Sequence, residues 1–275
     1  MKLIVGTANL ARAYGQNSSY LAIEQYRQIV DSERGNSCFA TDTSPDYGEA
    51  ELICNEILSA GSQVYSKIRY NGSTGRFAQS ALKPDLTKIT LVHNWDELSK
   101  SDRRKALYSL EKRARRGVIG GIGFSNYREF CEDELLSRFP SLYVQTPLNA
   151  LDQTNLERIG EIKENFPNVT VLARSVFLQG AMMSMETKPV MHEHPDLGRF
   201  KQACLELNLP ILRVALEFVR AQSCVDGLVI GVRGIQDWLE IKKEIFAPRL
   251  NGLEGFNWRS LRSLDQGLVD PRKWK

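Results

Sequence analysis

A regular alternation of short apolar runs and amphipathic, helix-like segments is the feature that most constrains the fold of this 275-residue chain. The runs are apolar along most of their length, which indicates strands that are buried on both faces of a parallel sheet. Eight such strands with helices between them predict a closed (β/α)8 TIM barrel. The predicted strands span residues 2–7, 38–42, 64–68, 88–93, 118–124, 142–146, 168–174 and 226–232.

The segments between these runs have the spacing of apolar side chains that is typical of helices. Residues 71–84 predict a short helix at most, and residues from about 249 onward predict a tail that caps the barrel. An open, doubly wound sheet is the alternative, but it usually carries a glycine-rich phosphate loop, and no GxGxxG occurs here. No composition shift marks a boundary, so residues 1–275 are expected to form one domain. The predicted helices span residues 20–33, 49–60, 102–115, 127–139, 154–166, 196–207 and 235–245.

The charge and composition of the chain argue against binding to nucleic acid or membranes. A net charge of +3 is too small to favour nucleic acid as a partner. No run approaches the roughly 18 apolar residues of a membrane-spanning helix, and the first residues lack the apolar core of a signal peptide. The five cysteines are odd in number and form no CxxC pair, which predicts free thiols in a reducing compartment. A cytoplasmic protein is therefore expected, as a monomer or small homo-oligomer.

Four polar side chains stand at or just after the ends of predicted strands in the first part of the chain. Asp42, Lys67 and His93 each follow an apolar run, and Tyr47 lies in the turn after the first of these runs. Active sites of such barrels are built at the C-terminal ends of the strands and in the loops that follow them. The four side chains are therefore expected to meet at one mouth of the barrel.

The chemistry that these four groups support together is proton transfer. A free phenol has a pKa near 10, too high for ready proton exchange at neutral pH. We expect the Lys67 ammonium to lower the pKa of Tyr47, Asp42 to pair with Lys67, and His93 to aim a substrate carbonyl or tune the acid. Taken singly, each residue has an ordinary structural explanation as a cap, a solvated side chain or core packing. Their joint position on successive strand ends favours a catalytic role.

Several segments in order along the chain resemble the motifs of the aldo-keto reductase family. ATDTSPDYGEAE is similar to the family stretch in which Asp and Tyr lie five positions apart, and VYSKI is similar to the strand of its catalytic lysine. The similarity continues to the DPRKW near the end, so it covers essentially the whole chain. The other matching segments are LVHNWDEL, GIGFSNY, VQTPLNAL and LARSVFLQGAM, the last of which is similar to bacterial members.

The resemblance implies an NAD(P)H-dependent oxidoreductase that reduces a small aldehyde or ketone to an alcohol. Tyr47 would be the general acid, with Asp42 and Lys67 tuning it and His93 orienting the carbonyl. The family binds its nicotinamide dinucleotide in extended form across the barrel mouth, without a Rossmann fold. The positions that match its cofactor-binding residues are Ser125, Asn126, Gln145, Arg174, Ser175, Gly231, Arg233 and Glu240.

Two departures from the family pattern affect the cofactor. Many members have a Tyr stacked on the nicotinamide where this chain has Arg174. A guanidinium can also stack on an aromatic ring, but less favourably on the cationic oxidised form, which predicts a bias towards reduction. The second departure lies where the family binds the 2′-phosphate of the cofactor. Here Asp237 replaces a basic residue and Ile241 replaces an Asn, although Glu240 is retained. NADP(H) is favoured by the resemblance, and NAD(H) stays open because a carboxylate would repel a 2′-phosphate. Residues that could compensate are Arg233, Lys242 and Lys243.

Weaker features add to this hypothesis. Trp95, two residues after His93, is the preferred candidate for shaping the substrate pocket, ahead of Tyr14 and Phe177. The histidines of MHEHPD lack cysteine partners and give only a weak metal signal, so no metal site is predicted. The segment SVFLQGAM resembles members linked to polysaccharide biosynthesis, which suggests a sugar-derived carbonyl. The alternative function is a nicotinamide-binding, redox-sensing regulatory subunit with little turnover.

Overall fold

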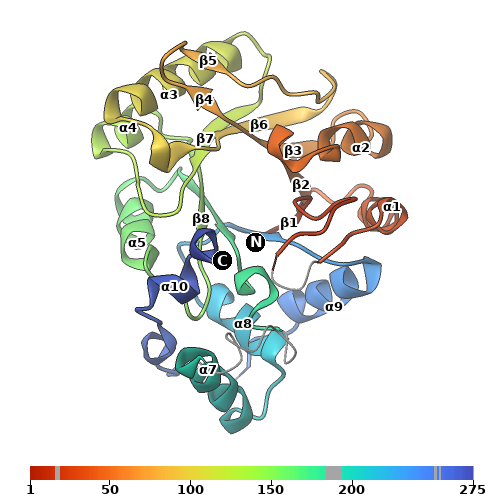
Figure 1. The fold of residues 1–275 in the computed structure, drawn as a ribbon, viewed down its shortest axis with the longest axis vertical. Coiled ribbons are helices and arrows are strands. Elements are labelled where there is room, and N and C mark those ends of the chain that lie inside the picture. Colours follow the sequence, from red (N-terminus) through yellow and green to blue (C-terminus); the bar gives the residue numbers. More distant parts are fainter. Residues whose placement is uncertain (16–18, 184–193, 251–252, 254, 275) are drawn as a thin grey trace.

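A computed structural model describes residues 1–15, 19–183, 194–250, 253 and 255–274, and within them eight parallel strands close into a barrel. Neighbouring strands follow the chain order, and β1 completes the ring by pairing with both β2 and β10. Figure 1 shows these strands at the centre of a ring of helices. The predicted (β/α)8 barrel in a single domain is confirmed, and the bounds 1–275 stay a prediction. The strands are β1 (Lys2–Gly6), β2 (Phe39–Thr43), β3 (Gln63–Ile68), β6 (Thr87–Val92), β7 (Gly121–Ser125), β8 (Tyr143–Pro147), β9 (Thr170–Arg174) and β10 (Gly227–Ile230).

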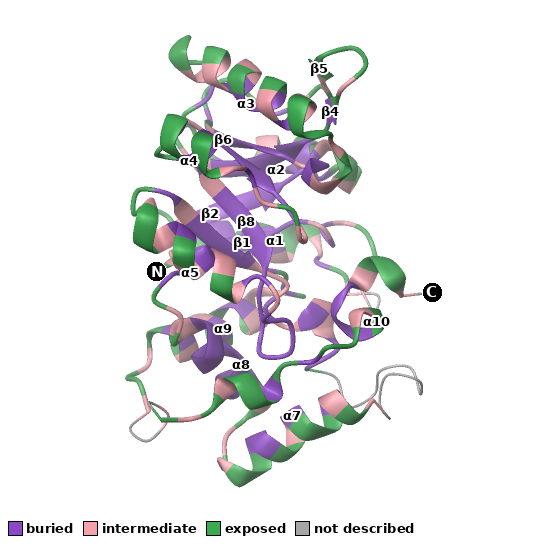
Figure 2. Cartoon of the chain, turned by 90° about the vertical axis from the view of Figure 1, so that its left-hand side faces the viewer, coloured by how far each residue is buried: buried purple, intermediate pink, exposed green. Residues whose placement is uncertain are grey.

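Helices cover the outside of the barrel between most consecutive strands. Their apolar faces are buried against the strands, while their outer faces are exposed, as Figure 2 shows. Helix α8 was not predicted from the sequence, although Leu212, Leu216 and Val219 have helical spacing and are buried. The helices around the barrel are α1 (Ile23–Ser32), α2 (Ala50–Ile57), α3 (Lys100–Arg115), α4 (Asp133–Arg138), α5 (Leu156–Asn165), α7 (Pro195–Glu206), α8 (Ile211–Arg220) and α9 (Ile235–Phe246).

The structure has no helix at residues 71–84, where a short helix at most was expected, and it shortens one predicted helix. Residues 71–84 form no helix, because Asn71 accepts hydrogen bonds from Ser73 and Thr74 in a tight turn. This turn connects the short antiparallel strands β4 (Tyr70–Asn71) and β5 (Arg76–Phe77).

The helix predicted over residues 127–139 is reduced to α4. The backbone N–H groups of Tyr127 and Arg128 donate to the carboxylate of Asp96 at 2.7 Å and 2.8 Å, and the helix begins only after Glu132, whose backbone is extended. Asp96 belongs to the 3-10 helix η2 (Trp95–Glu97), which follows β6. The loop after β7 is thus tied to the loop after β6.

The chain after residue 255 packs across loops on the C-terminal side of the strands. It contains η4 (Trp258–Leu261), α10 (Gln266–Val269) and η5 (Pro271–Lys273). Gln153 donates a hydrogen bond of 2.6 Å to the carbonyl oxygen of Trp258, and Ser263 donates one of 2.9 Å to Leu151. Figure 1 shows this segment in dark blue beside α5 and β8.

The interior has two apolar layers. A small cluster fills the barrel itself, and a larger one lies between the strands and the helices. In the part of the chain that the structure describes, no helix is long and apolar enough to cross a membrane. The residues inside the barrel are Ile4, Ala40, Tyr65, Ile89, Leu91, Leu172 and Val229.

The close contact between β7 and β8 at Gly123 gives a test of the barrel packing. A Cβ atom at Gly123 would lie 1.9 Å from the backbone oxygen of Tyr143, which cannot move aside without distorting β8. We expect Gly123→Ala to lower the free energy of unfolding by about 3 kcal/mol or more, as measured by chemical denaturation. Gly160→Ala is the control, because a Cβ there meets nothing within 4 Å and Gly160 lies inside α5. The control should be neutral or more stable by up to about 1 kcal/mol. Equal stability of the two variants would contradict the packing shown here.

Candidate active site

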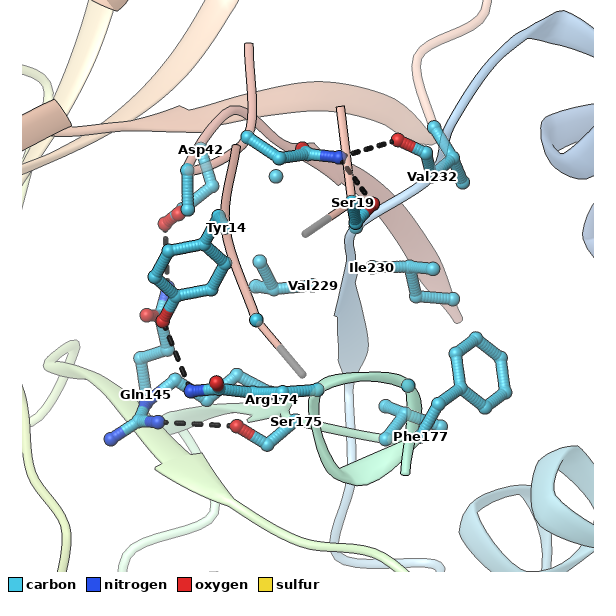
Figure 3. Close-up of a pocket in the computed structure, with 18 of the residues that line it drawn as sticks. Tyr14, Ser19, Asp42, Gln145, Arg174, Ser175, Phe177, Val229, Ile230 and Val232 are labelled. Carbon is cyan, nitrogen blue, oxygen red and sulfur yellow. Dashed lines mark hydrogen bonds between the residues drawn. The ribbon is translucent and has the colours of Figure 1, made fainter. Parts of the chain in front are cut away.

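A cavity of about 900 Å³ opens at the C-terminal ends of the barrel strands. Figure 3 shows Asp42 and Gln145 on one side of it and Ser19 and Val232 on another. The structure brings most of the residues proposed from the sequence together in this one cavity. Those that line it are Asp42, Tyr47, Lys67, His93, Ser125, Gln145, Arg174, Ser175, Gly231, Arg233 and Glu240.

A buried ion pair lies at the bottom of the site. Asp42 from β2 and Lys67 from β3 are 2% and 3% exposed and contact each other through Oδ1 and Nζ. The second carboxylate oxygen of Asp42 accepts a hydrogen bond of 2.7 Å from Gln145 of β8. Burial lowers the pKa of Lys67, and the charge of Asp42 opposes this shift. Both oxygens of the carboxylate are therefore held by partners, which fixes the position of the ammonium.

Tyr47 lies above this ion pair, at the end of the 3-10 helix η1 (Pro45–Tyr47). Its ring centroid is 5.0 Å from Nζ of Lys67 and 6.0 Å from the ring centroid of His93. Contrary to the expectation from the sequence, the pKa of Tyr47 is raised, first by burial and then by the charge of Asp42. Lys67 does not reverse this shift, because its charge is paired with Asp42. Tyr47 is therefore a protonated phenol at neutral pH.

His93, directly after β6, faces two neighbours through its Nδ1 atom. Oγ of Ser44 is 3.3 Å and a carboxylate oxygen of Asp46 is 2.9 Å from this nitrogen. Burial, and then the positive charges of Lys67 and Arg174, lower the pKa of His93 to about 3. The imidazole is therefore neutral over the physiological range of pH. Neither Ser44 nor Asp46 was proposed from the sequence, where nothing distinguishes them from ordinary turn residues.

Further polar groups lie beside the tetrad, the name used below for Asp42, Tyr47, Lys67 and His93. They suit a ligand with an amide-bearing ring. Ser125 donates to Oε1 of Gln145 at 3.4 Å, and both residues line the cavity. Asn126 is fully buried and does not line the cavity, and its side-chain oxygen has no partner among the described residues. The polar side chains that do reach the cavity here, Ser125 and Gln145, offer a hydroxyl and an amide, which suit a ligand that carries both donors and acceptors, as a carboxamide does.

Arg174, at the end of β9, lies over an aromatic ring of the protein itself. Its guanidinium carbon is 4.0 Å from the centroid of Tyr127, and it donates to the backbone oxygen of Asn126 at 2.9 Å. Arg272 from the C-terminal segment lies over the same ring at 3.7 Å. Ser175, the next residue along from Arg174, has a positive φ of 56°, a conformation that costs energy outside glycine and is found often at functional sites.

The far end of the cavity lies where β10 leads into α9. The space beside Gly231 is open, since a Cβ atom on this residue would meet nothing within 4 Å. Asp237 holds Arg233 through both of its carboxylate oxygens, at 2.8 Å and 3.0 Å. Lys242 is instead paired with Glu33 and does not line the cavity. Of the basic residues proposed to compensate for Asp237, only Arg233 lines this end, and Asp237 already binds it.

The prediction that Trp95 shapes the substrate pocket is corrected. Trp95 is fully buried, stacks on Phe124 with 4.2 Å between ring centroids, and does not line the cavity. The turn of η2 directs this side chain into the core beneath the loop. Tyr14 and Phe177, ranked lower from the sequence, do line the cavity. Arg272 also lines it, and no local sequence signal connects a residue so far along the chain with the tetrad.

The histidine loop contributes no metal site to the described part of the chain. His192 lies outside the described residues. His194 accepts a hydrogen bond from the backbone of Asp196 at the start of α7, and its Nε2 is 3.1 Å from Asp265. No group of three or more metal-ligating side chains occurs among the residues that the structure describes.

Comparisons with known proteins agree with this arrangement of strands and loops. A model of the aldo/keto reductase family matches residues 2–245. The aldo-keto reductase AKR11C1 from Bacillus halodurans (holo form) is similar, with a TM-score of 0.70 and 17% identity over 99% of this chain and 95% of that chain. The glycerol dehydrogenase AKR11B4 from Gluconobacter oxydans has a TM-score of 0.65 and 17% identity over 98% and 92% of the two chains. At such identities the structural likeness shows the fold alone. No curated protein sequence matches this chain.

The buried ion pair gives a test of the site's energetics. Asp42→Asn should lower the free energy of unfolding by about 3–5 kcal/mol, because the Lys67 ammonium is left buried without a counter-charge. Adding Lys67→Met should recover most of this loss, since an apolar side chain of similar length needs no partner. Chemical denaturation of the three proteins measures both effects. A double variant that is no more stable than Asp42→Asn alone would contradict the pairing.

Proposed function

The chain belongs to the aldo/keto reductase family, and we propose that it is a nicotinamide-dependent enzyme that reduces an aldehyde or ketone to an alcohol. The observation that carries this proposal is the position of Tyr47 over the buried Asp42–Lys67 pair, in a cavity at the strand ends. The substrate is a small carbonyl compound.

Tyr47 is proposed to donate its phenolic proton to the carbonyl oxygen. Its raised pKa keeps the proton in place until negative charge develops on that oxygen. The phenolate left behind would be stabilised by the Lys67 ammonium 5.0 Å from the ring centroid, which Asp42 holds in position. The buried pair thus stabilises the phenolate that proton transfer leaves behind, and not the protonated phenol.

A nicotinamide cofactor would supply the hydride. Ser125, Asn126 and Gln145 are proposed to hold its carboxamide, and the exposed side of the Arg174 guanidinium to lie against the ring. The cavity-lining side chains of Ser125 and Gln145 support the proposal. The remainder of the dinucleotide would extend along the cavity past the other proposed contacts, Ser175, Gly231, Arg233 and Glu240.

The choice between NADP(H) and NAD(H) depends on charge at the far end of the cavity. Family resemblance favours NADP(H). The local residues favour NAD(H), because Asp237 neutralises Arg233 and Ile241 stands where the family pattern has an Asn. A 2′-phosphate would have to displace Asp237 from the guanidinium before it could bind there.

Residues 1–275 are proposed to act as one catalytic unit in the cytoplasm, as a monomer or small homo-oligomer. The five cysteines, none of which forms a disulfide, support a reducing compartment. A redox-sensing regulatory subunit would bind the cofactor tightly and reduce no carbonyl compound at a measurable rate. Cofactor titration followed by turnover assays across a panel of aldehydes separates these two functions.

Tyr47→Phe is the direct test of the proposed acid. It should lower kcat by about 10²–10⁴-fold with any carbonyl compound that the unmodified protein reduces, because a positioned acid contributes that much. Cofactor affinity, followed by nucleotide fluorescence, should stay nearly constant. Tyr14→Phe is the matched control, since it removes a hydroxyl from the same cavity, where Gln179 donates to it at 3.1 Å. Undiminished turnover by Tyr47→Phe, or an equal loss in Tyr14→Phe, would count against Tyr47 as the acid.

Asp237→Asn tests the effect of charge at the end of the cavity where the 2′-phosphate of NADPH would bind. It frees the Arg233 guanidinium and removes one negative charge, so NADPH affinity should rise about tenfold while NADH affinity changes little. Separate fluorescence titrations of NADPH and NADH measure the ratio. Glu164→Gln, on the exposed face of α5, makes the same change in net charge away from the cavity and should leave both affinities unaltered. An unchanged NADPH to NADH ratio in Asp237→Asn would exclude this residue as a determinant.

A further inference from the structure

The ring of His93 is held in a way that specifies which of its nitrogens carries the proton. Ser44 donates its only hydroxyl proton to the backbone oxygen of Lys67, at 2.7 Å. Its Oγ atom therefore has only lone pairs to offer to Nδ1 of His93, 3.3 Å away. For this contact to be a hydrogen bond, Nδ1 must be the donor.

Asp46 imposes the same requirement independently. Its Oδ2 atom is 2.9 Å from Nδ1 of His93. A nitrogen lone pair facing a carboxylate oxygen at that distance would be repelled, whereas an N–H group is attracted. Two acceptors on two different residues thus place the proton on Nδ1.

The remaining nitrogen, Nε2, is then a lone-pair acceptor as long as the ring is neutral. Burial and the nearby cations Lys67, Arg174 and Arg69 keep it neutral by lowering the pKa of His93 to about 3. Nε2 has no partner among the described residues, and His93 lines the cavity. This nitrogen is accordingly the one left to contact a ligand.

We propose that His93 accepts a hydrogen bond from the substrate through Nε2, and that Ser44 and Asp46 are positioning residues that fix this tautomer. A carbonyl oxygen has no proton to give, so Nε2 does not polarise the reacting group. A hydroxyl on the neighbouring carbon can donate to Nε2 while Tyr47 donates to the carbonyl oxygen. The site therefore selects hydroxyaldehydes and hydroxyketones, a class that includes sugar-derived carbonyls. This specificity rests on the reductase function proposed above.

The tautomer can be read directly by ¹⁵N NMR of the histidine rings in the cofactor-free protein. Protonated and unprotonated ring nitrogens have well-separated shifts, and the chain contains only three histidines. The signals that disappear in His93→Gln belong to His93. We expect a protonated Nδ1 and an unprotonated Nε2 at neutral pH. A protonated Nε2, alone or in an imidazolium, would overturn the proposal.

Kinetics with a matched substrate pair test the specificity. 2-Hydroxypropanal and propanal differ by one hydroxyl. We expect the ratio of their kcat/KM values to fall about tenfold in the double variant Ser44→Ala/Asp46→Asn, because Nδ1 then faces neither fixed acceptor and the other tautomer becomes accessible. Comparing the ratio between proteins cancels the intrinsic reactivity of the two aldehydes. Glu49→Gln, an exposed carboxylate in the same turn that does not line the cavity, is the control and should keep the original ratio.

The outcomes distinguish this proposal from the one on which it rests. An unchanged ratio in Ser44→Ala/Asp46→Asn overturns the accepting role of Nε2 even if both aldehydes are reduced. If no carbonyl compound of the wider panel is reduced with NADH or NADPH, while NMR shows the proton on Nδ1, the reductase function fails and the assignment of the accepting nitrogen stands.

Discussion

The site depends on one buried contact, the ion pair of Asp42 and Lys67. Neither charge is stable alone in the interior, because the loss of hydration is compensated only by the partner. Their strands are neighbours in the barrel, and Gln145 joins them from β8, a strand that does not pair with either. The pair therefore connects strands on different sides of the barrel. Tyr47 and His93, which lie next to it, are positioned by this contact.

The same pair also determines the electrostatics of the residues that contact a ligand. Because Asp42 neutralises Lys67, the loss of hydration on burial outweighs the positive charge of Lys67 in setting the pKa of Tyr47. The pKa is raised, and the phenol keeps its proton. His93 is half-buried, and the nearby cations disfavour a second proton on its ring. The cavity thus presents two neutral hydrogen-bonding groups, one a donor and the other an acceptor, over a fixed charge pair. This arrangement suits a neutral substrate on which charge develops only during the reaction.

The barrel and the meeting of the tetrad in one cavity were predictable from sequence, because continuous apolar runs indicate strands and parallel strands end on the same side. Contacts that depend on the path of a loop were not. Trp95 follows His93 by two positions, yet the turn of η2 sends it into the core. Arg272 lines the cavity from the opposite end of the sequence. The sign of the pKa shift of Tyr47 was wrong for a related reason, since it depends on burial and on which partner holds Lys67.

The pairing of β1 with β10 has a consequence for how the protein is made. Residues 2–5 find their hydrogen-bond partners in residues 227–230, so the ring of strands cannot close on the ribosome until most of the chain has emerged. During that time β1 has an open edge and its apolar side chains lack their final neighbours. The cavity wall is completed later still, when Arg272 reaches Tyr127. Synthesis therefore leaves a long interval in which the nascent chain exposes a strand edge and has no finished active site, and chaperone contacts during that interval would bear on the yield of folded protein.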